Sequence, residues 1–347
     1  MKHSFLDDYS EGAHPKILAA LSETNMVQQT AYGDDAYSQE ARDMLRQHMG
    51  KVNPDIWFVA SGTLANILAI SSALKSHEAV IAPASGHIVV RETGAIEATG
   101  HKIITVPPVQ GKLTPDSIEA ALDANAHFPH MAKPRLVYIS NATEVGTLYT
   151  KAELKAISKL SRERGLLLLL DGARLGAALS ATKNDVTFKD IAELVDIFWV
   201  GGTKVGALLG EAIVIPNPQL REDFAFHIKQ RGALLAKGRI LGLQFRELFR
   251  DRLYFDLACH ANSMAAQLSQ GITEAGYGFF AETETNQLFP ILPNALIARL
   301  KKRFDFYVWE PWDAENSVTR LVTSWATTKE HVDAFLAEVS SLDRKAV

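Results

Sequence analysis

Short apolar runs alternate with helix-like stretches through the first 254 residues of the chain. Strands are predicted at 56–60, 79–82, 102–106, 136–140, 166–170, 197–200 and 211–215. Residues 64–74 and 150–164 follow helical spacing, and Thr114-Pro115-Asp116 is a typical helix start, with the threonine as N-cap. Strands that are apolar throughout are buried on both faces, so the pattern predicts an α/β fold with a mostly parallel sheet.

The pattern changes after about residue 255. A helix-like stretch to residue 275 is followed by strand-like runs at 287–292, 306–309 and 319–325, and by a last helix that begins at Lys329. This order predicts a small α+β domain at the C-terminal end of the chain.

Composition and charge are those of an ordinary soluble globular protein. Of the 347 residues, 47% are hydrophobic and 22% are charged, and the formal net charge is −4. This charge provides no general attraction to nucleic acid or to an anionic membrane, and we expect neither as a partner. The single cysteine, Cys259, cannot form an internal disulfide, does not suggest a metal site and fits a reducing cytoplasm.

The sequence also gives no sign of a membrane segment or of a signal peptide. The start of the chain turns acidic at Asp7-Asp8, and the longest apolar run, around 166–170, is far shorter than the ~20 residues that a membrane span needs. We therefore predict a soluble cytoplasmic protein.

Two chemically active residues follow neighbouring apolar runs. Asp171 comes directly after 166–170, and Lys204 follows 197–200 and a glycine pair. Ligands of parallel sheets gather beyond the carboxyl ends of the strands. A pyridoxal phosphate (PLP) enzyme needs such a pair, because the lysine holds the aldehyde as a Schiff base and the acid pairs with the pyridine nitrogen. The alternatives are a helix-capping aspartate and a surface lysine.

Other segments supply what such a cofactor requires. Ser61-Gly62-Thr63 turns from a strand into a helix and suits a phosphate, although an ordinary N-cap has the same residues. His87 follows a strand and can stack on an aromatic ring or move protons, or it is an ordinary surface or core histidine. Thr203 is a candidate phosphate contact. Arg174 offers a fork for a carboxylate, or forms a structural ion pair.

Two further cations fit an anion, with a solvated or paired side chain as the alternative. Lys237 lies in a basic cluster at 230–239, and Arg320 stands in the strand-like run 319–325.

Taken in order, these segments resemble the L-threonine aldolase and β-eliminating lyase family of fold type I PLP-dependent enzymes. The resemblance covers most of the chain and is carried by Asp8-Tyr9-Ser10-Glu11-Gly12, Tyr32-Gly33-Asp34-Asp35-Ala36-Tyr37, Ser61-Gly62-Thr63-Leu64-Ala65-Asn66, Gly86-His87, Asp171-Gly172-Ala173-Arg174, Gly201-Gly202-Thr203-Lys204 and Arg320-Leu321-Val322-Thr323. It implies an N-terminal segment, 1–15, that packs at the active site, a large PLP-binding domain at 16–254 and a small domain at 255–347. It also implies a homo-oligomer, dimer or tetramer, with shared active sites.

The resemblance assigns a role to each matching residue. Lys204 resembles the Schiff-base lysine, Asp171 the pyridine partner and His87 the histidine that stacks on the ring. The remaining cofactor-binding residues would be Ser61, Gly62, Thr63, Arg174, Thr203 and Lys237, the last from a neighbouring subunit. The substrate-binding residues would be Asp8, Arg174, Arg320 and Tyr37, the tyrosine again from a neighbour.

Two stretches depart from the family pattern. Leu6-Asp7-Asp8 stands where many relatives read Ser-Asp-Thr or Ser-Asp-Asn. Glu144 stands where some relatives have a histidine that approaches the substrate hydroxyl, so the residue that takes the hydroxyl proton stays open between His87 and a water held by His87 and Glu144.

These features predict an aldehyde-lyase that cleaves L-threonine or L-allo-threonine to glycine and an aldehyde, with PLP and no metal. A β-eliminating lyase, an aminotransferase, or a PLP-fold protein that binds without catalysis are the alternatives. A nicotinamide enzyme is disfavoured because the chain lacks a Gly-x-Gly-x-x-Gly fingerprint after a strand.

Overall fold

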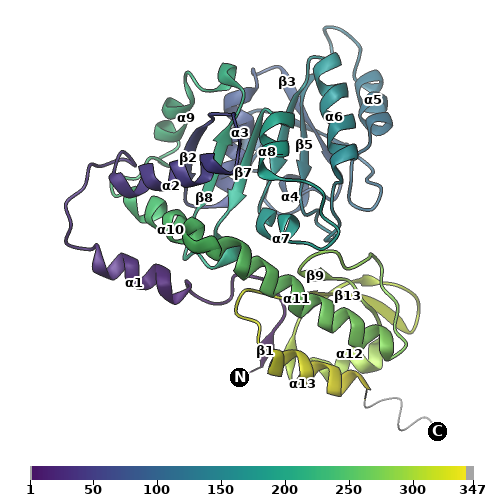
Figure 1. Cartoon of the computed structure of the whole chain (residues 1–347). Helices are drawn as coiled ribbons and strands as arrows, with labels where there is room; N and C mark the ends of the chain where they lie inside the picture. Colours follow the sequence, from purple (N-terminus) through teal and green to yellow (C-terminus); the bar gives the residue numbers. More distant parts are fainter. Residues whose placement is uncertain (1, 341–347) are drawn as a thin grey trace.

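A seven-stranded sheet forms the centre of the chain, and helices lie on both of its sides (Figure 1). The computed structural model describes residues 2–340. The strand order is β2-β8-β7-β6-β5-β3-β4. The bounds are β2 (Asp55–Val59), β3 (Glu78–Pro83), β4 (Lys102–Val106), β5 (Lys133–Ser140), β6 (Leu167–Asp171), β7 (Ile197–Gly201) and β8 (Glu211–Ile215).

Only β8 runs against its neighbours in this sheet, since it is antiparallel to both β2 and β7 and the other pairings are parallel. The predicted α/β class with a mostly parallel sheet is confirmed, and so are the seven strands within a few residues at their ends.

Each strand of the sheet contributes to two separate hydrophobic cores. In β6, Leu168 and Leu170 belong to one core, and Leu167 and Leu169 belong to the other. Successive side chains of a strand point to opposite faces, so a sheet covered on both sides needs apolar residues at every position. This is why the strands read as continuous apolar runs.

The helices divide between the two faces of the sheet. Helices α3 (Gly62–Ala73) and α9 (Phe224–Gln230) pack in one core, and α2 (Ala36–Gln47), α6 (Lys151–Glu163) and α10 (Arg239–Phe249) pack in the other. The remaining helices of this part are α1 (Pro15–Glu23), α4 (His87–Val90), α5 (Pro115–Ala124), α7 (Leu175–Leu179) and α8 (Phe188–Leu194).

Threonine N-caps fix where three of these helices begin. Thr114, Thr150 and Thr187 each accept a hydrogen bond from a backbone N–H three residues on, and the side chain of that residue bonds back to the cap. These capping boxes satisfy N–H groups that have no partner inside the helix. The predicted cap at Thr114 is confirmed.

The C-terminal part is a four-stranded antiparallel sheet with helices packed against it. Its elements are α11 (Leu253–Glu274), β9 (Gln287–Leu288), β10 (Ile291–Pro293), α12 (Asn294–Leu300), β12 (Tyr307–Pro311), β13 (Asn316–Val322) and α13 (Lys329–Ser340). Among residues 2–340, no helix combines the length and the apolarity that crossing a membrane requires.

Two strand predictions in this part are wrong in detail. The single strand predicted at 287–292 is two strands, because Pro290 has no N–H to donate to a ladder. The strand predicted at 319–325 lies three residues earlier, as β13, and the chain leaves the ladder after Val322.

The first residues of the chain connect the two parts. β1 (His3–Ser4) pairs in parallel with β11 (Phe304–Asp305), and Phe5 is buried in the C-terminal core. Farther along, the N–H of His14 donates to the carbonyl of Gly206, beside Lys204. The division at 1–15, 16–254 and 255–347 stays a prediction, and residues 1 and 341–347 lie outside the described residues.

Candidate active site

The strand directions bring the predicted site residues to one edge of the sheet. β2, β5, β6 and β7 all end there, and each leads into a segment with polar residues. The reversed strand β8 begins at the same edge, where Glu211 pairs with Gly201. One edge therefore receives side chains from five strands.

A cavity of about 810 Å³ opens at this edge. Its size is within the ordinary range for a bound cofactor or substrate. The predicted site residues that line it are Ser61, Gly62, Thr63, His87, Glu144, Asp171, Arg174, Thr203, Lys204 and Arg320.

Lys204 lies in the short 3-10 helix η2 (Thr203–Val205), which follows β7. Its side chain is partly exposed, to the cavity that it lines. Burial of the amine and the positive charge of Arg174 lower the pKa of Lys204 from 10.5 to about 8. Among residues 2–340, no carboxylate forms an ion pair with this amine, so it is available as a nucleophile near neutral pH.

Asp171 is the last residue of β6 and is 3% exposed. Its Oδ2 accepts hydrogen bonds from the Tyr138 hydroxyl at 2.6 Å and from the Asn66 amide at 3.1 Å, and its Oδ1 accepts one from the Ala173 N–H at 2.9 Å. A carboxylate has about four lone-pair directions, so one more N–H donor can be accommodated. Helix α7 begins four residues later, so Asp171 is not its N-cap.

His87 is the first residue of α4, and its side chain is 43% exposed. Nδ1 of the ring lies 2.7 Å from Oε1 of the buried Glu92. Because the ring lines the cavity, its face is available to a planar ligand.

The segment at 61–63 combines an ordinary helix cap with an anion site. Ser61 is the N-cap of α3, and its hydroxyl accepts a hydrogen bond from the Leu64 N–H at 3.4 Å. The N–H groups of Gly62 and Thr63 belong to the first turn, where no carbonyl of the helix can meet them. They point out of the positive end of the helix dipole, which suits a phosphate.

Arg174 and Asp8 form a bidentate ion pair. Nε donates to Oδ2 at 2.8 Å and Nη2 donates to Oδ1 at 3.0 Å. Asp8 is 1% exposed and does not line the 810 Å³ cavity, so the structure places it behind Arg174 and away from direct contact with a ligand there. Burial would raise the pKa of Asp8, but the charges of Arg174 and Lys204 outweigh it and hold this pKa below its usual value.

Arg320 reaches the cavity from β13. Its Nη2 donates to Oε1 of Gln287 at 2.8 Å, and its guanidinium lies 5.8 Å from the ring centre of Trp309. Burial and the positive charge of Arg174 lower the pKa of Arg320 to about 10. Two guanidiniums that repel one another in a poorly solvated cavity create a site for an anion.

Glu144 lies in the loop that follows β5. Its Oε1 accepts hydrogen bonds from the Ser140 hydroxyl at 2.7 Å and from the His87 N–H at 3.1 Å. Its Oε2 is buried and has no hydrogen-bond partner among the described residues. Burial raises the pKa of Glu144, which favours a carboxyl that can take or give a proton.

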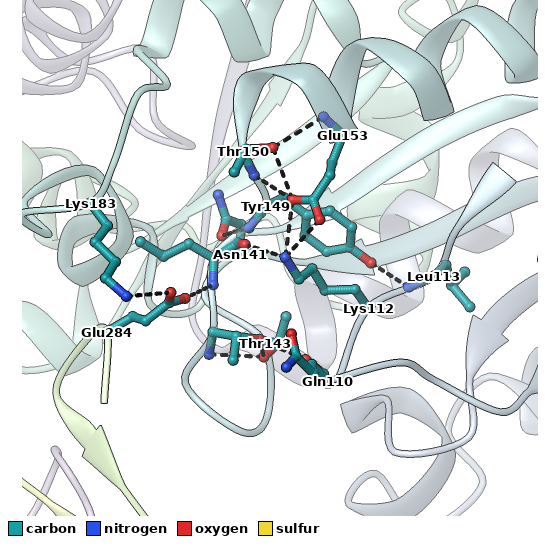
Figure 2. A network of polar contacts seen from close by, with 12 residues as sticks. Gln110, Lys112, Leu113, Asn141, Thr143, Tyr149, Thr150, Glu153, Lys183 and Glu284 are labelled. Carbon is teal, nitrogen blue, oxygen red and sulfur yellow. Dashed lines mark hydrogen bonds and ion pairs between the residues drawn. The ribbon is translucent and has the colours of Figure 1, made fainter. Parts of the chain in front are cut away.

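Polar contacts from several elements hold this loop in place (Figure 2). The Lys112 amine donates to the Leu148 carbonyl at 2.9 Å and to the Glu153 carboxylate at 2.8 Å. From the C-terminal part, Glu284 accepts a hydrogen bond from the Leu148 N–H at 2.8 Å and lies 3.6 Å from the Lys183 amine. The loop that carries Glu144 is therefore held by contacts from the large sheet part, through Lys112, and from the C-terminal part, through Glu284.

Besides Asp8, two predicted site residues do not line the cavity of this chain. Tyr37 lies on α2, with its ring 4.6 Å from the guanidinium of Arg246 and 5.4 Å from that of Arg239. Lys237 is exposed in the turn before α10. The two residues lie on neighbouring segments, since the Tyr32 N–H donates to the Ala236 carbonyl at 3.0 Å.

Sequence reasoning missed Glu211, the first residue of β8. Its Oε2 accepts a hydrogen bond from the Gly202 N–H at 2.9 Å, and its Oε1 accepts one from the Thr203 hydroxyl at 2.8 Å. In this arrangement the Thr203 hydroxyl donates its hydrogen bond to Glu211, so it is not free to donate to a phosphate. Burial raises the pKa of Glu211 to about 7. Only the direction of β8 brings this residue to the cavity, and its apolar run does not reveal that direction.

These groups fit pyridoxal phosphate. Lys204 would hold the aldehyde, and the remaining lone pair of Asp171 would accept from the ring nitrogen. His87 would contact the ring face, and the N–H groups at 61–63 would hold the phosphate. Each charged group of the cofactor would then have a partner. The phosphate would lie at the start of α3, and the protonated ring nitrogen would donate to Asp171.

The fold and the site define a PLP-dependent enzyme of fold type I. A family model described as beta-eliminating lyase matches residues 6–294. The chain belongs to the β-eliminating lyase family, as its sequence motifs predict.

Relatives of known name agree with this membership. The chain is 36% identical to the low specificity L-threonine aldolase of Pseudomonas sp. (strain NCIMB 10558), over 97% of both chains. It is 47% identical to a solved structure of Leishmania major threonine aldolase, with a TM-score of 0.96 over 98% of this chain and 99% of that one. An aspartate aminotransferase of Thermus thermophilus, 12% identical, shares the fold with a TM-score of 0.73 over 98% of this chain and 91% of that one.

The lowered pKa of Lys204 leads to a testable pH dependence. In cofactor-free protein, reductive methylation of Lys204 by formaldehyde should be half-maximal near pH 8, because only the neutral amine reacts and it predominates above its pKa. Mass spectrometry of the Lys204 peptide measures the extent at each pH, and the exposed Lys155 reports general reactivity in the same samples. Methylation that rises only toward pH 10.5 would contradict the assigned environment.

Proposed function

We propose that this chain cleaves L-threonine and L-allo-threonine, and β-hydroxy-α-amino acids of this kind, to glycine and an aldehyde. One observation carries the proposal. A lysine of lowered pKa, a strand-end acid and two arginines converge on one cavity, in a chain similar over 97% of its length to a low specificity L-threonine aldolase.

The substrate carboxylate binds between Arg174 and Arg320. Asp8 occupies Nε and Nη2 of Arg174, which leaves Nη1 for a ligand, and Gln287 holds Arg320 from the side. With the carboxylate held at two points, the rotation of the amino acid is restricted and its Cα–Cβ bond can be set in the orientation for cleavage.

Bound pyridoxal phosphate supplies the electron sink for the pair that the broken Cα–Cβ bond leaves behind. Asp171 keeps the sink strong, because its carboxylate stabilises the positive charge of a protonated ring nitrogen. Tyr138 and Asn66 hold this carboxylate in place through hydrogen bonds to Oδ2.

The β-hydroxyl must lose its proton as the aldehyde forms. His87, or a water held between His87 and Glu144, takes this proton. Two features support Glu144 as a partner: its Oε2 has no hydrogen-bond partner among residues 2–340, and burial raises its pKa. A carboxyl with these properties exchanges protons more readily near neutral pH than an ordinary surface glutamate.

Lys204→Ala tests the central assignment. We expect the variant to lose the absorption band of the lysine-bound cofactor and to lose threonine cleavage by at least about 10³-fold, since the nucleophile that carries the cofactor is gone. Glycine and acetaldehyde are both quantified, with Lys155→Ala as the control.

Other products would identify other reactions. Pyruvate and ammonia would indicate β-elimination, and a half-reaction to pyridoxamine phosphate would indicate an aminotransferase. Wild-type cleavage by Lys204→Ala would exclude the assigned role of the lysine, and a wild-type protein that binds PLP without any turnover would be a binding protein.

Glu144→Gln tests the proton transfer. The amide keeps an oxygen for the Ser140 and His87 donors but cannot take up a proton, so kcat for threonine should fall by about 10²-fold while KM changes little. Glu310→Gln, an exposed glutamate on β12, is the control. An unchanged kcat and pH profile in Glu144→Gln would leave His87 as the base without help from this carboxyl.

We also propose that the chain forms a homo-oligomer, dimer or tetramer, in which Tyr37 and Lys237 of one subunit complete the site of another. Neither lines the cavity of its own chain, and the segments that carry them are joined by the hydrogen bond from Tyr32 to Ala236. Figure 1 shows α1 and the segment that joins it to α2 on the outside of the molecule. Met26 and Tyr32 in this segment are 88% and 45% exposed. Large apolar side chains exposed in one chain favour an interface in which another subunit covers them.

A cytoplasmic location remains a prediction, which the single cysteine, Cys259, favours.

Co-expression of Tyr37→Ala and Lys204→Ala tests the shared site. A mixed dimer would contain one site with both native residues, so random assortment should restore about a quarter of wild-type activity. Each variant is inactive or weak alone. Activity that does not exceed the sum of the two separate variants would place Tyr37 in its own subunit, and light scattering on the wild type separates dimer from tetramer.

A further inference from the structure

Glu92 is a buried carboxylate to which the proposed reaction gives no direct role. Its side chain is 0% exposed, and its Oε1 lies 2.7 Å from Nδ1 of His87, five residues earlier in the chain. An ionised carboxylate can only accept hydrogen bonds, so Nδ1 of His87 must carry the hydrogen. In the neutral ring, Nε2 then keeps its lone pair.

Asn66 connects this pair to Asp171. Its amide Nδ2 donates one hydrogen to Oε1 of Glu92 at 2.8 Å and the other to Oδ2 of Asp171 at 3.1 Å. The Trp199 N–H, which can only donate, binds Oδ1 of the same amide at 3.0 Å and so fixes its orientation. One side chain therefore bridges the carboxylate behind the histidine and the carboxylate for the ring nitrogen.

Stability of the fold does not account for an acid at position 92. Oε2 of Glu92 is buried and has no hydrogen-bond partner in the described part of the chain. A buried carboxylate with an unsatisfied oxygen is costly, and an apolar residue of similar volume is often at least as stable in such a place. The acid is therefore better explained by its effect on its hydrogen-bond partners, His87 and Asn66.

We propose that Glu92 is a positioning residue that holds the His87 ring in the Nδ1–H form, with Nε2 presented to the cavity, and that Asn66 keeps this ring in register with Asp171. The inference rests on the proposed function, in which His87 and Asp171 contact the cofactor. A carboxylate that orients an imidazole and selects its tautomer is the arrangement that makes histidine effective in proton transfer.

The tautomer can be observed without substrate. In protein labelled with ¹⁵N-histidine, long-range ¹H–¹⁵N spectra distinguish Nδ1–H from Nε2–H, and His87→Asn identifies the signal of His87. The wild type should show the Nδ1–H form. Glu92→Gln, which keeps an oxygen acceptor, should retain that form, whereas Glu92→Leu should shift to Nε2–H.

The same variants should differ in their bound cofactor and in turnover. Glu92→Leu should change the visible circular dichroism of the bound cofactor and lower kcat for threonine by about tenfold or more, because the imidazole loses its orientation. Glu92→Gln should recover most of the loss. Glu97→Gln, an exposed glutamate nearby, should match the wild type in every readout. Glu92→Ala replaces the leucine variant if that protein does not fold.

Two results would overturn the inference. One is Glu92→Leu, or Glu92→Ala in its place, with the wild-type tautomer and an unchanged kcat. The other is a changed tautomer with no effect on either the circular dichroism or kcat. A wild type that shows the Nδ1–H form and binds PLP but does not cleave threonine would refute the proposed function alone, and the tautomer of the variants would still decide the role of Glu92.

Discussion

The cost of holding charged groups away from water determines how this cavity is built. Burial of the Lys204 amine, together with repulsion by Arg174, lowers the pKa of this amine. Asp8 offsets part of this cost because it neutralises Arg174 through two hydrogen bonds. Each acid at the cavity is likewise held by backbone or side-chain donors, so the loops around it have little freedom to move without breaking a buried polar contact.

This arrangement explains why the cofactor-facing side of the cavity and the substrate-facing side differ in character. Toward the sheet, Asp171 is held by three donors within 3.1 Å and stands at the end of a buried strand. Toward the C-terminal part, Arg320 and Gln287 come from different strands, and the mouth includes exposed residues such as Tyr307. The side at Asp171 suits a cofactor, which stays the same for every substrate. The side at Arg320 and Gln287 is where substrate preference would be decided.

The fold and the central pair were predictable from sequence because both depend on local patterns. Apolar strands followed by polar turns indicated a parallel sheet, and that topology alone placed Asp171 and Lys204 at one edge. The family, the fold type and the cofactor are confirmed by the comparisons. Glu211 could not be found in this way, because a run of apolar residues reads the same in either strand direction. The pairing of Asp8 with Arg174 spans 166 positions, and no local spacing encodes it.

The connection made by β1 has a consequence for the order in which the protein folds. The segment from His3 to Phe5 takes its place only after strands far along the chain exist: His3 pairs with Phe304, and the Val322 N–H donates to the Phe5 carbonyl. Until these contacts form, nothing holds Asp8 beside Arg174. Contacts of such long sequence separation form late in folding. The sheet and Lys204 can therefore be in place before this cavity is complete, because Asp8 reaches Arg174 only once the C-terminal part has folded.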